Sequence, residues 1–172
     1  MMTKIAMVIA NNWFQDLEFG NPFQCFQDAG FETEIFSGKG GMCRGVFGKE
    51  IKETKNLKDL HGADFDGIVF VGWGGAYEQY AGNEEYFRCA REAKILWAIC
   101  IAPSLIAESW LFQGKKITGR DDGQGTEIEI MQKNGAIFID EEVVQDGEII
   151  TANGPQASLL FGKKIVEQFL EK

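Results

Sequence analysis

Repeated alternation of short apolar runs with helix-like segments restricts the possible folds of this chain more than any other feature of its sequence. The runs at 5–10, 68–71 and 95–99 are apolar almost throughout, which is typical of strands covered on both faces. Helix-like segments lie between and after these runs, at 16–29, 83–94, 103–110 and 156–170. This order predicts a single α/β domain over residues 1–172, with a mostly parallel sheet and helices on both of its faces.

The remaining pattern adds shorter elements to the same scheme. Further strands are expected at 31–36, 117–118, 136–139 and 148–152, a glycine-rich hairpin at 38–51, and another helix at 126–133. We expect Asp16 to cap the first helix. We expect Pro22 to kink it, because proline lacks the N–H that would bond to the carbonyl of Glu18. In such folds, ligands bind beyond the carboxyl ends of the strands.

The charge balance restricts the class of partner. The chain has 17 basic and 26 acidic side chains and a formal net charge of −9. This excess of acid argues against nucleic acid and anionic membranes as partners, because both are bound through clustered basic residues. No phosphate-binding glycine motif follows a strand, and Asp16 and Glu18 after the first strand would repel a phosphate group. We therefore expect no nucleotide or flavin cofactor.

Histidine and cysteine usage restricts the chemistry further. His61 is the one histidine, and no two of the four cysteines are spaced C-x-x-C. These counts argue against a zinc site or a dithiol redox motif, so we expect no metal. The first residues become polar at Asn11, unlike a secretory signal, and no apolar run reaches membrane-spanning length. We expect a cytoplasmic protein with reduced thiols.

Cys100 is the candidate nucleophile. It lies where the apolar run at 95–99 turns directly into a helix whose first turn suits Pro103. Small residues stand two positions before and two positions after it, at Ala98 and Ala102, as the sharp turn of a nucleophile elbow requires. The amides of a helix N-terminus favour the thiolate, so we expect a lowered pKa for this thiol. The alternative is an unreactive cysteine in the core.

Glu18 is the second candidate, within an aromatic segment that follows the first strand. A carboxyl group desolvated among Trp13, Phe14 and Phe19 would have a raised pKa and be protonated at neutral pH. It could then donate a hydrogen bond to a thiolate and act as a general acid or base. The alternative is an acidic residue in the first turn of a helix, stabilised by the helix dipole.

A glycine-rich loop follows the run at 68–71, with the sequence Gly72-Trp73-Gly74-Gly75. Its backbone amides are candidates to stabilise an oxyanion. A flexible loop is the alternative, because glycine adopts such conformations without steric cost. His61 precedes the same run, so we expect it at the opposite end of the sheet and away from the site.

Several landmarks occur in the order found in the ThiJ/PfpI superfamily, at 4–9, 16–22, 65–70, 98–103 and 146–155. The chain therefore resembles this superfamily, which includes deglycase-like, glyoxalase III-like and intracellular protease-like proteins. The resemblance implies a flavodoxin-like, three-layer α/β/α sandwich of the class I glutamine amidotransferase type. It also implies a reactive Cys100 with a protonated Glu18 as its partner.

The same resemblance implies oxyanion-type amides at Trp73, Gly74 and Ile101, and places Asn153 near the substrate pocket. Members of the superfamily are commonly homodimers, and some form higher homo-oligomers, so we expect a homo-oligomer here. A small carbonyl compound is the implied substrate.

The chain also departs from the superfamily. Protease-like members have a histidine directly after the nucleophile, where this chain has Ile101. Deglycase-like members have one in the segment where this chain has Gly135-Ala136. An arginine that often precedes the Gly-Pro pair is replaced by Asn153, which removes a contact to an anion. Loss of a histidine acid–base predicts slow turnover.

Three functions remain open from the sequence. In the first, a Cys100 thiolate attacks a small reactive aldehyde such as methylglyoxal, assisted by Glu18, as in a glyoxalase III or deglycase. In the second, the protein is a non-catalytic oxidative-stress sensor or chaperone that responds to oxidation of Cys100. The third, an intracellular cysteine peptidase or amidase, is weakest, because that chemistry usually needs a base beside the nucleophile.

Overall fold

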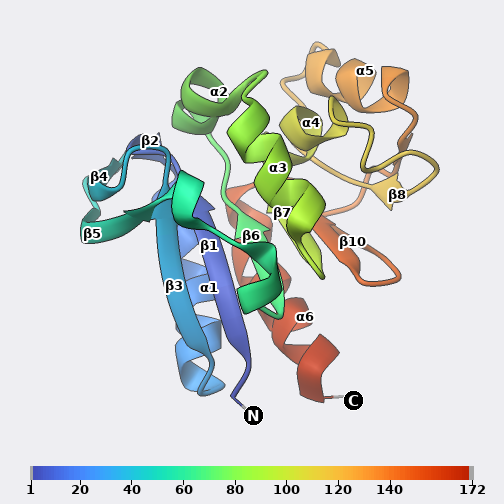
Figure 1. Cartoon of the computed structure of the whole chain (residues 1–172). Helices are drawn as coiled ribbons and strands as arrows, with labels where there is room; N and C mark the ends of the chain where they lie inside the picture. The colour runs from blue at the N-terminus through green and yellow to red at the C-terminus, as the bar shows by residue number, and fades with distance from the viewer. Residues whose placement is uncertain (1, 171–172) are drawn as a thin grey trace.

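The computed structural model describes residues 2–170 and is built around a nine-stranded sheet in the order β10-β11-β7-β6-β1-β3-β5-β4-β2 (Figure 1). Four parallel strands form its centre, β1 (Lys4–Ile9), β6 (Gly67–Phe70), β7 (Leu96–Ile99) and β11 (Ile149–Ala152). Every residue of β6 and β7 is buried, as their apolar composition predicts. Because the four strands are parallel, their carboxyl ends lie at one edge, where ligands bind in α/β folds.

The side of the sheet beyond β1 ends in a hairpin. β3 (Glu32–Ser37) pairs in parallel with β1 and with β5 (Glu50–Asn56). β4 (Gly41–Gly45) pairs antiparallel with β5, and β2 (Asn12–Phe14) lies against β4. The hairpin predicted at 38–51 is therefore confirmed, although its second strand continues further along the chain.

Helices cover both faces of the sheet, which confirms the predicted α/β class. On one face, α1 (Asp16–Asp28) packs against α6 (Ser158–Leu170), and α3 (Glu84–Glu92) lies on the other (Figure 1). Contact between α1 and α6 is close because α6 has Gly162 at the crossing. A Cβ atom there would lie 2.8 Å from the Cα of Pro22.

Three shorter helices lie at the carboxyl end of the parallel strands, α2 (Gly74–Tyr80), α4 (Ala102–Ala107) and α5 (Thr126–Lys133) (Figure 1). The sequence pattern predicts α5 and, with a later end, α4. It misses α2, because this helix begins inside the glycine-rich loop. These helices frame the edge of the sheet at which Cys100 lies.

The strand pattern in the C-terminal third differs from the prediction in one respect. β8 (Lys116–Ile117) and β9 (Ile137–Phe138) are present near their predicted positions, but they form a separate two-stranded sheet. The strand that pairs with β11 across the Asp146-Gly147 turn is β10 (Val143–Asp146), which the sequence pattern misses. Its two valines are too short a run to stand out from the polar residues around them.

The start of α1 also differs from the prediction. The residue that caps this helix is Gln15, whose side chain accepts hydrogen bonds from the N–H groups of Leu17 and Glu18. The expectation that Asp16 caps the helix is wrong. Its carboxylate instead accepts hydrogen bonds from the backbone of Phe47 and Lys49 in the β4–β5 hairpin. The helix continues through Pro22 to its end at Asp28.

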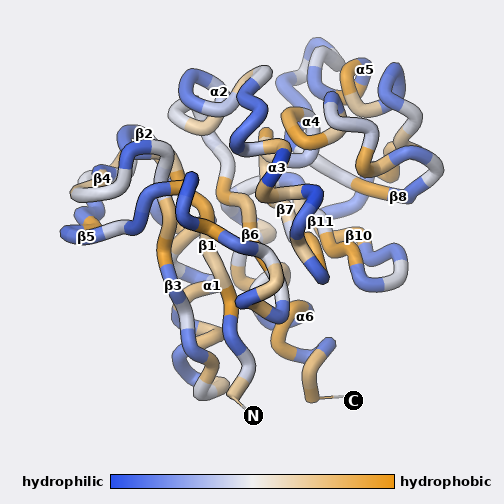
Figure 2. Tube along the Cα trace, in the orientation of Figure 1, coloured by the Kyte–Doolittle hydropathy of each residue, from blue (hydrophilic) through white to orange (hydrophobic). Residues whose placement is uncertain are grey.

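The hydrophobic core follows the central strands. Figure 2 shows apolar residues concentrated along β6 and β7, and Trp97 on β7 is among the largest fully buried side chains. No helix among residues 2–170 is long and apolar enough to cross a membrane.

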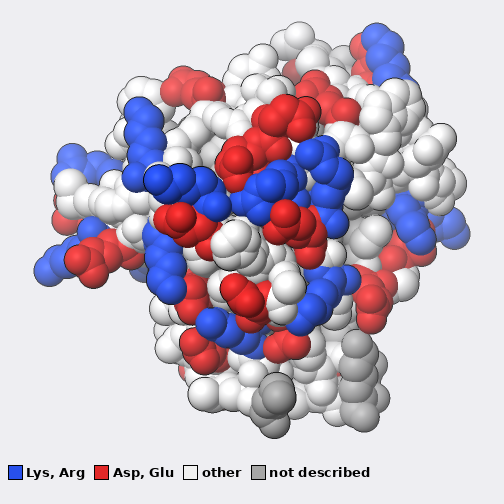
Figure 3. Space-filling model, viewed as in Figure 1, with Lys and Arg blue, Asp and Glu red and all other residues white. Residues whose placement is uncertain are grey.

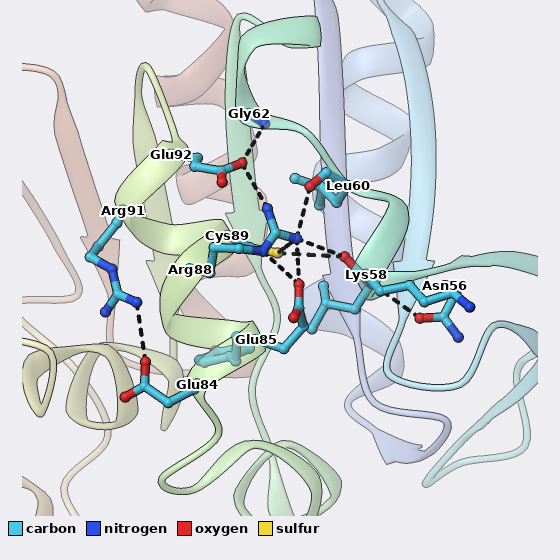
Figure 4. A network of polar contacts seen from close by, with 12 residues as sticks. Asn56, Lys58, Leu60, Gly62, Glu84, Glu85, Arg88, Cys89, Arg91 and Glu92 are labelled. Atoms are coloured by element: carbon cyan, nitrogen blue, oxygen red, sulfur yellow. Dashed lines mark hydrogen bonds and ion pairs between the residues drawn. The ribbon is translucent and has the colours of Figure 1, made fainter.

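Arg88 on α3 joins this helix to the segment that precedes β6 (Figure 4). Its guanidinium donates hydrogen bonds to the carbonyls of Leu57 and Leu60 and pairs with Glu85 and Glu92. Because of these two hydrogen bonds, Arg88 satisfies carbonyl groups that otherwise need another donor. Basic and acidic side chains are interspersed over the face of the molecule that contains this cluster (Figure 3).

We expect Arg88→Ala to lower the free energy of unfolding by about 1–3 kcal/mol, because buried acceptors lose a charged donor. Arg91→Ala is the matched control, since Arg91 lies on the same helix and pairs with the exposed Glu84 (Figure 4). It should change stability by no more than about 0.5 kcal/mol. Urea unfolding of the two variants measures the difference, and equal losses would contradict the role given to Arg88.

Candidate active site at Cys100

Cys100 occupies a sharp turn between β7 and α4. Its φ angle is +64°, which is uncommon for a residue other than glycine. The turn is held by its backbone, because its N–H donates to the carbonyl of Ala152 at 2.9 Å and its carbonyl accepts from the N–H of Arg120 at 2.7 Å. The predicted nucleophile elbow is therefore present, with its conformation fixed by neighbours on both sides.

Gly72 allows the loop after β6 to approach this elbow. A Cβ atom at Gly72 would lie 2.6 Å from the carbonyl oxygen of Ile99 and 2.7 Å from the Cβ of Cys100. Such distances are too short for any side chain without a shift of the backbone. The glycine in the loop is thus required for close packing, and flexibility does not account for it.

Glu18 lies beside Cys100, although 82 positions separate them in the chain. Its side chain is fully buried, and Oε2 accepts a hydrogen bond from the N–H of Gly72 at 3.0 Å. The other oxygen, Oε1, has no nitrogen or oxygen partner among the described residues, and the Cys100 thiol interacts with the carboxyl group. The two residues selected from the sequence are therefore neighbours, at the carboxyl end of the sheet.

Burial determines the protonation of Glu18. Desolvation raises the pKa of this carboxyl group from 4.5 to about 8, and the contacts with Cys100 and the N–H of Gly72 offset only part of that rise. Glu18 is thus protonated at neutral pH, as the sequence predicts. The alternative of an ionised carboxylate at the helix N-terminus does not fit a fully buried side chain.

The pKa of the Cys100 thiol moves in the direction opposite to the prediction. Burial, followed by the nearby charge of Glu18, raises it well above 9.0, while the N–H groups of Trp73 and Ile101 favour the thiolate. The helix that follows has only six residues, so its N-terminus offers little to a sulfur atom that is 1% exposed. The expectation of a lowered thiol pKa is therefore wrong, because desolvation outweighs the amides.

The two groups titrate as a pair because they are in contact. At neutral pH the pair holds two protons, and the first is lost as the pH rises through about 8. The one proton that remains can be held by Cys100 Sγ or by the Glu18 carboxyl group, and the pKa of the thiol, raised well above 9.0, favours the sulfur. One arrangement of this singly protonated pair is a thiolate next to a carboxylic acid, which is the form suited to nucleophilic attack.

The four other predicted site residues surround the elbow. The backbone N–H groups of Trp73 and Ile101 face the sulfur, and Trp73 has a φ angle of +81° where it precedes α2. Gly74 is the first residue of α2 and lines a cavity beside the site. Asn153 lines a second cavity together with Cys100, and its backbone N–H bonds to Glu142.

Two adjoining cavities lie over this region. The first, which we call the cysteine cavity, has a volume of about 260 Å³ and includes Cys100 and Asn153 in its wall. The second, which we call the outer cavity, has a volume of about 430 Å³ and is lined by Tyr77 and Glu127 among others. Trp73 and Arg120 line both cavities. A ligand in the outer cavity is therefore close to one that contacts the cysteine.

Arg120 and Glu127 are site residues that sequence reasoning missed. They form an ion pair between the turn after β8 and the start of α5. Residues 120–125 show no periodic pattern, so they read as a simple surface turn. The position of Arg120 in the sequence is the feature that indicates a role in the site. It follows the short strand predicted at 117–118, and ligand-binding residues lie beyond strand ends in this class of fold.

His61 lies away from the site, as predicted. It is exposed and precedes the short helix η2 (Gly62–Asp64), which leads into β6. Since β6 and β7 are parallel, His61 is at the amino end of the sheet, whereas Cys100 is at the carboxyl end. A histidine from this chain therefore does not reach the cysteine.

The chain is similar in sequence to known proteins. A family model described as the DJ-1/PfpI family matches residues 3–168. An uncharacterised protein of Methanocaldococcus jannaschii is 33% identical over 168 residues, which cover 95% of this chain and 81% of that protein. Deglycase PfpI of Pyrococcus furiosus is 30% identical over 160 residues, or 88% of this chain and 90% of that protein.

The solved structures agree with the sequence comparison. The crystal structure of a ThiJ/PfpI domain protein from Brachyspira murdochii has a TM-score of 0.90 to this chain at 24% identity, covering 100% of this chain and 99% of that one. At this identity the likeness shows a common fold. Together with the family match over nearly the whole sequence, it establishes that the chain belongs to the DJ-1/PfpI family.

Proposed function

We propose that the protein is a cysteine-dependent enzyme that converts small 2-oxoaldehydes, such as methylglyoxal, into 2-hydroxy acids. The observation that carries this proposal is the buried, protonated Glu18 in contact with the Cys100 thiol, with two backbone N–H groups facing the sulfur. These are a proton donor, a nucleophile and anion-stabilising donors within one small site, which is what addition to a carbonyl requires. The relative named as a deglycase is compatible with this chemistry.

The first step is addition of sulfur to the aldehyde. In the singly protonated pair, Sγ of Cys100 forms a bond to the aldehyde carbon while the carbonyl π electrons move to oxygen. That oxygen takes the proton held by Glu18, which gives a hemithioacetal and a carboxylate. The N–H groups of Trp73 and Ile101, which face the sulfur, are close to the developing negative charge.

The second step uses the carboxylate that the first step creates. Glu18 removes the hydrogen of the former aldehyde carbon as a proton, and the electron pair moves toward the adjacent ketone to give an enediolate. The hydroxyl proton on the former aldehyde oxygen moves to the former ketone oxygen, and Glu18 returns its proton to the former ketone carbon. A carbonyl re-forms at the carbon bonded to sulfur, which gives a thioester of a 2-hydroxy acid. Water then hydrolyses the thioester and releases the thiol, so the sequence consumes one water and needs no external oxidant or reductant.

The other two functions have less support. Oxidation of Cys100 in a sensor needs no substrate cavity, so that function does not account for the two adjoining cavities beside the elbow. A peptidase usually needs a base beside the nucleophile, and the next residue is Ile101.

Consumption of methylglyoxal and formation of lactate test the proposal. We expect the wild type to form lactate slowly and Cys100→Ala to be reduced to the uncatalysed background, because the covalent intermediate cannot form. Cys25→Ala is the matched control, since Cys25 lies on α1 at the contact with α6, away from the cavities. Equal rates for wild type and Cys100→Ala would overturn the proposal.

A further inference from the structure

The outer cavity contains groups that conversion of a three-carbon aldehyde does not use. Its volume of about 430 Å³ exceeds that of the cysteine cavity, and its wall combines aromatic and charged side chains. Trp73, Tyr77 and Ile101 supply the apolar part, whereas Arg120 and Glu127 supply the charged part. In enzymes, such neighbouring space binds the part of a substrate that does not react.

Glu127 has an unused hydrogen-bond acceptor in this wall. Its side chain is 8% exposed, and Oε1 is paired with the guanidinium of Arg120. The second oxygen, Oε2, is buried and has no hydrogen-bond partner among the described residues. Because an unpaired buried carboxylate oxygen is costly, a ligand that donates a hydrogen bond there gains binding energy.

Arg120 connects this acceptor to the elbow. Its backbone N–H bonds to the carbonyl of Cys100 at 2.7 Å, so its Cα position is fixed relative to the nucleophile. Its side chain is 41% exposed and lines both cavities. A guanidinium has five N–H donors, and the pair with Glu127 leaves others to bond to a ligand oxygen.

The turn that joins the two residues is held in place by the side chain of Asp122. Its carboxylate accepts hydrogen bonds from the N–H groups of Gln124 and Thr126, and Gly123 and Gly125 adopt positive φ angles of 79° and 80°. These contacts return the chain toward the elbow and place Glu127 in the first turn of α5. The acceptor in the outer cavity is thus part of an ordered segment.

The charges in the two cavities favour a neutral, hydroxylated ligand. Arg120 and Glu127 neutralise one another, so an ionised ligand would be attracted by one and repelled by the other. A hydroxyl group suits both, because it can donate to the carboxylate of Glu127 and accept from the guanidinium of Arg120, both of which line the outer cavity. Asp121 and Asp140 line the cysteine cavity and further disfavour a carboxylate or phosphate. Trp73 and Tyr77 offer apolar surface to the C–H groups of such a chain.

We propose that the outer cavity binds the hydroxylated carbon chain of a sugar-derived 2-oxoaldehyde while its aldehyde carbon contacts Cys100. This substrate class rests on the proposed function and extends it, since the preferred substrate is longer than methylglyoxal. Glu127 and Arg120 are the residues that recognise the chain.

The test compares methylglyoxal with 3-deoxyglucosone, a six-carbon 2-oxoaldehyde that has three hydroxyl groups. We expect wild type to have the higher kcat/KM for the six-carbon compound. In Glu127→Gln, the ratio of kcat/KM for the six-carbon to the three-carbon substrate should fall at least about tenfold, the effect of one hydrogen bond to a charged group. Glu129→Gln is the matched control on α5, because Glu129 is exposed and pairs with Lys133; its ratio should stay at the wild-type value.

Tyr77→Ala is a second variant, at a 56% exposed position where folding is not at risk, and it should lower the same ratio. An unchanged ratio in both Glu127→Gln and Tyr77→Ala would overturn the inference, even if wild type consumes methylglyoxal. Saturation-transfer NMR of sorbitol binding to Cys100→Ala separates the two proposals. A signal with Cys100→Ala that is lost in the double variant Cys100→Ala/Glu127→Gln supports binding of a hydroxylated chain in the outer cavity, even if the wild type proves inactive. Absence of any signal with Cys100→Ala contradicts that binding.

Discussion

Glu18→Gln is expected to lower kcat/KM for a 2-oxoaldehyde by about 10²- to 10⁴-fold, the range that general acid–base groups contribute. Glutamine has nearly the same shape, so its side-chain oxygen can still accept the hydrogen bond from Gly72 that the wild-type carboxyl group accepts. It cannot donate a proton to the new oxyanion or remove one from the aldehyde carbon. The loss is thus assigned to proton transfer and leaves the elbow intact.

The pH dependence of wild-type kcat/KM follows from the protonation of Glu18. Because the pKa of Glu18 is raised to about 8, the reactive pair with one proton becomes populated as the pH rises toward that value. Wild-type kcat/KM should therefore increase from pH 6 to pH 8, in proportion to the singly protonated pair. Asp28→Asn is the control, since Asp28 is exposed at the end of the same helix. A wild-type profile that is flat from pH 6 to pH 8 would contradict the assignment.

The second large effect concerns stability, and the same variant measures it. The pKa of Glu18 is 4.5 when solvated and about 8 in the folded protein. Between these values the folded state holds a proton that the unfolded state has lost, so wild-type stability falls as the pH rises through this window. Glutamine has no such proton. The free energy of unfolding of wild type should thus decrease relative to Glu18→Gln by an amount on the order of 3–5 kcal/mol from pH 4.5 to pH 8.

Urea unfolding of both proteins at several pH values tests this directly. Other carboxyl groups, such as Glu34 and Glu92, have lowered pKa values because of their basic partners, and they affect both proteins equally. The difference between wild type and variant isolates Glu18 for that reason. A difference that stays constant from pH 4.5 to pH 8 would mean that Glu18 is not protonated in the folded state.

Much of the fold could be predicted from the sequence because strands that are buried on both faces are apolar along their whole length. The central strands read as short apolar runs, and their parallel order places the segments that follow them at one edge. Cys100 and Glu18 each follow such a run, so the sequence alone predicts that both lie at the same edge of the sheet. Gly72 follows a third run and completes the contact.

The parts that the sequence did not predict depend on distances between segments. The direction of the thiol pKa is set by how deeply Cys100 is buried against Glu18, and a motif does not report burial. The pair of Arg120 and Glu127 depends on a turn whose shape comes from hydrogen bonds between its backbone N–H groups and the Asp122 carboxylate. Gln15 replaces Asp16 as the cap because Asp16 is engaged by a hairpin that is distant in sequence.

The central claim is that Glu18 at the elbow is a buried carboxylic acid at neutral pH, in contact with the Cys100 thiol. The most direct measurement is the ¹³C NMR shift of the Glu18 carboxyl carbon as a function of pH, assigned by comparison with Glu18→Gln. The account predicts a carboxyl group that is protonated at pH 7 and titrates at about 8. A carboxyl carbon that titrates near 4.5, the value of an ordinary glutamate, would contradict it.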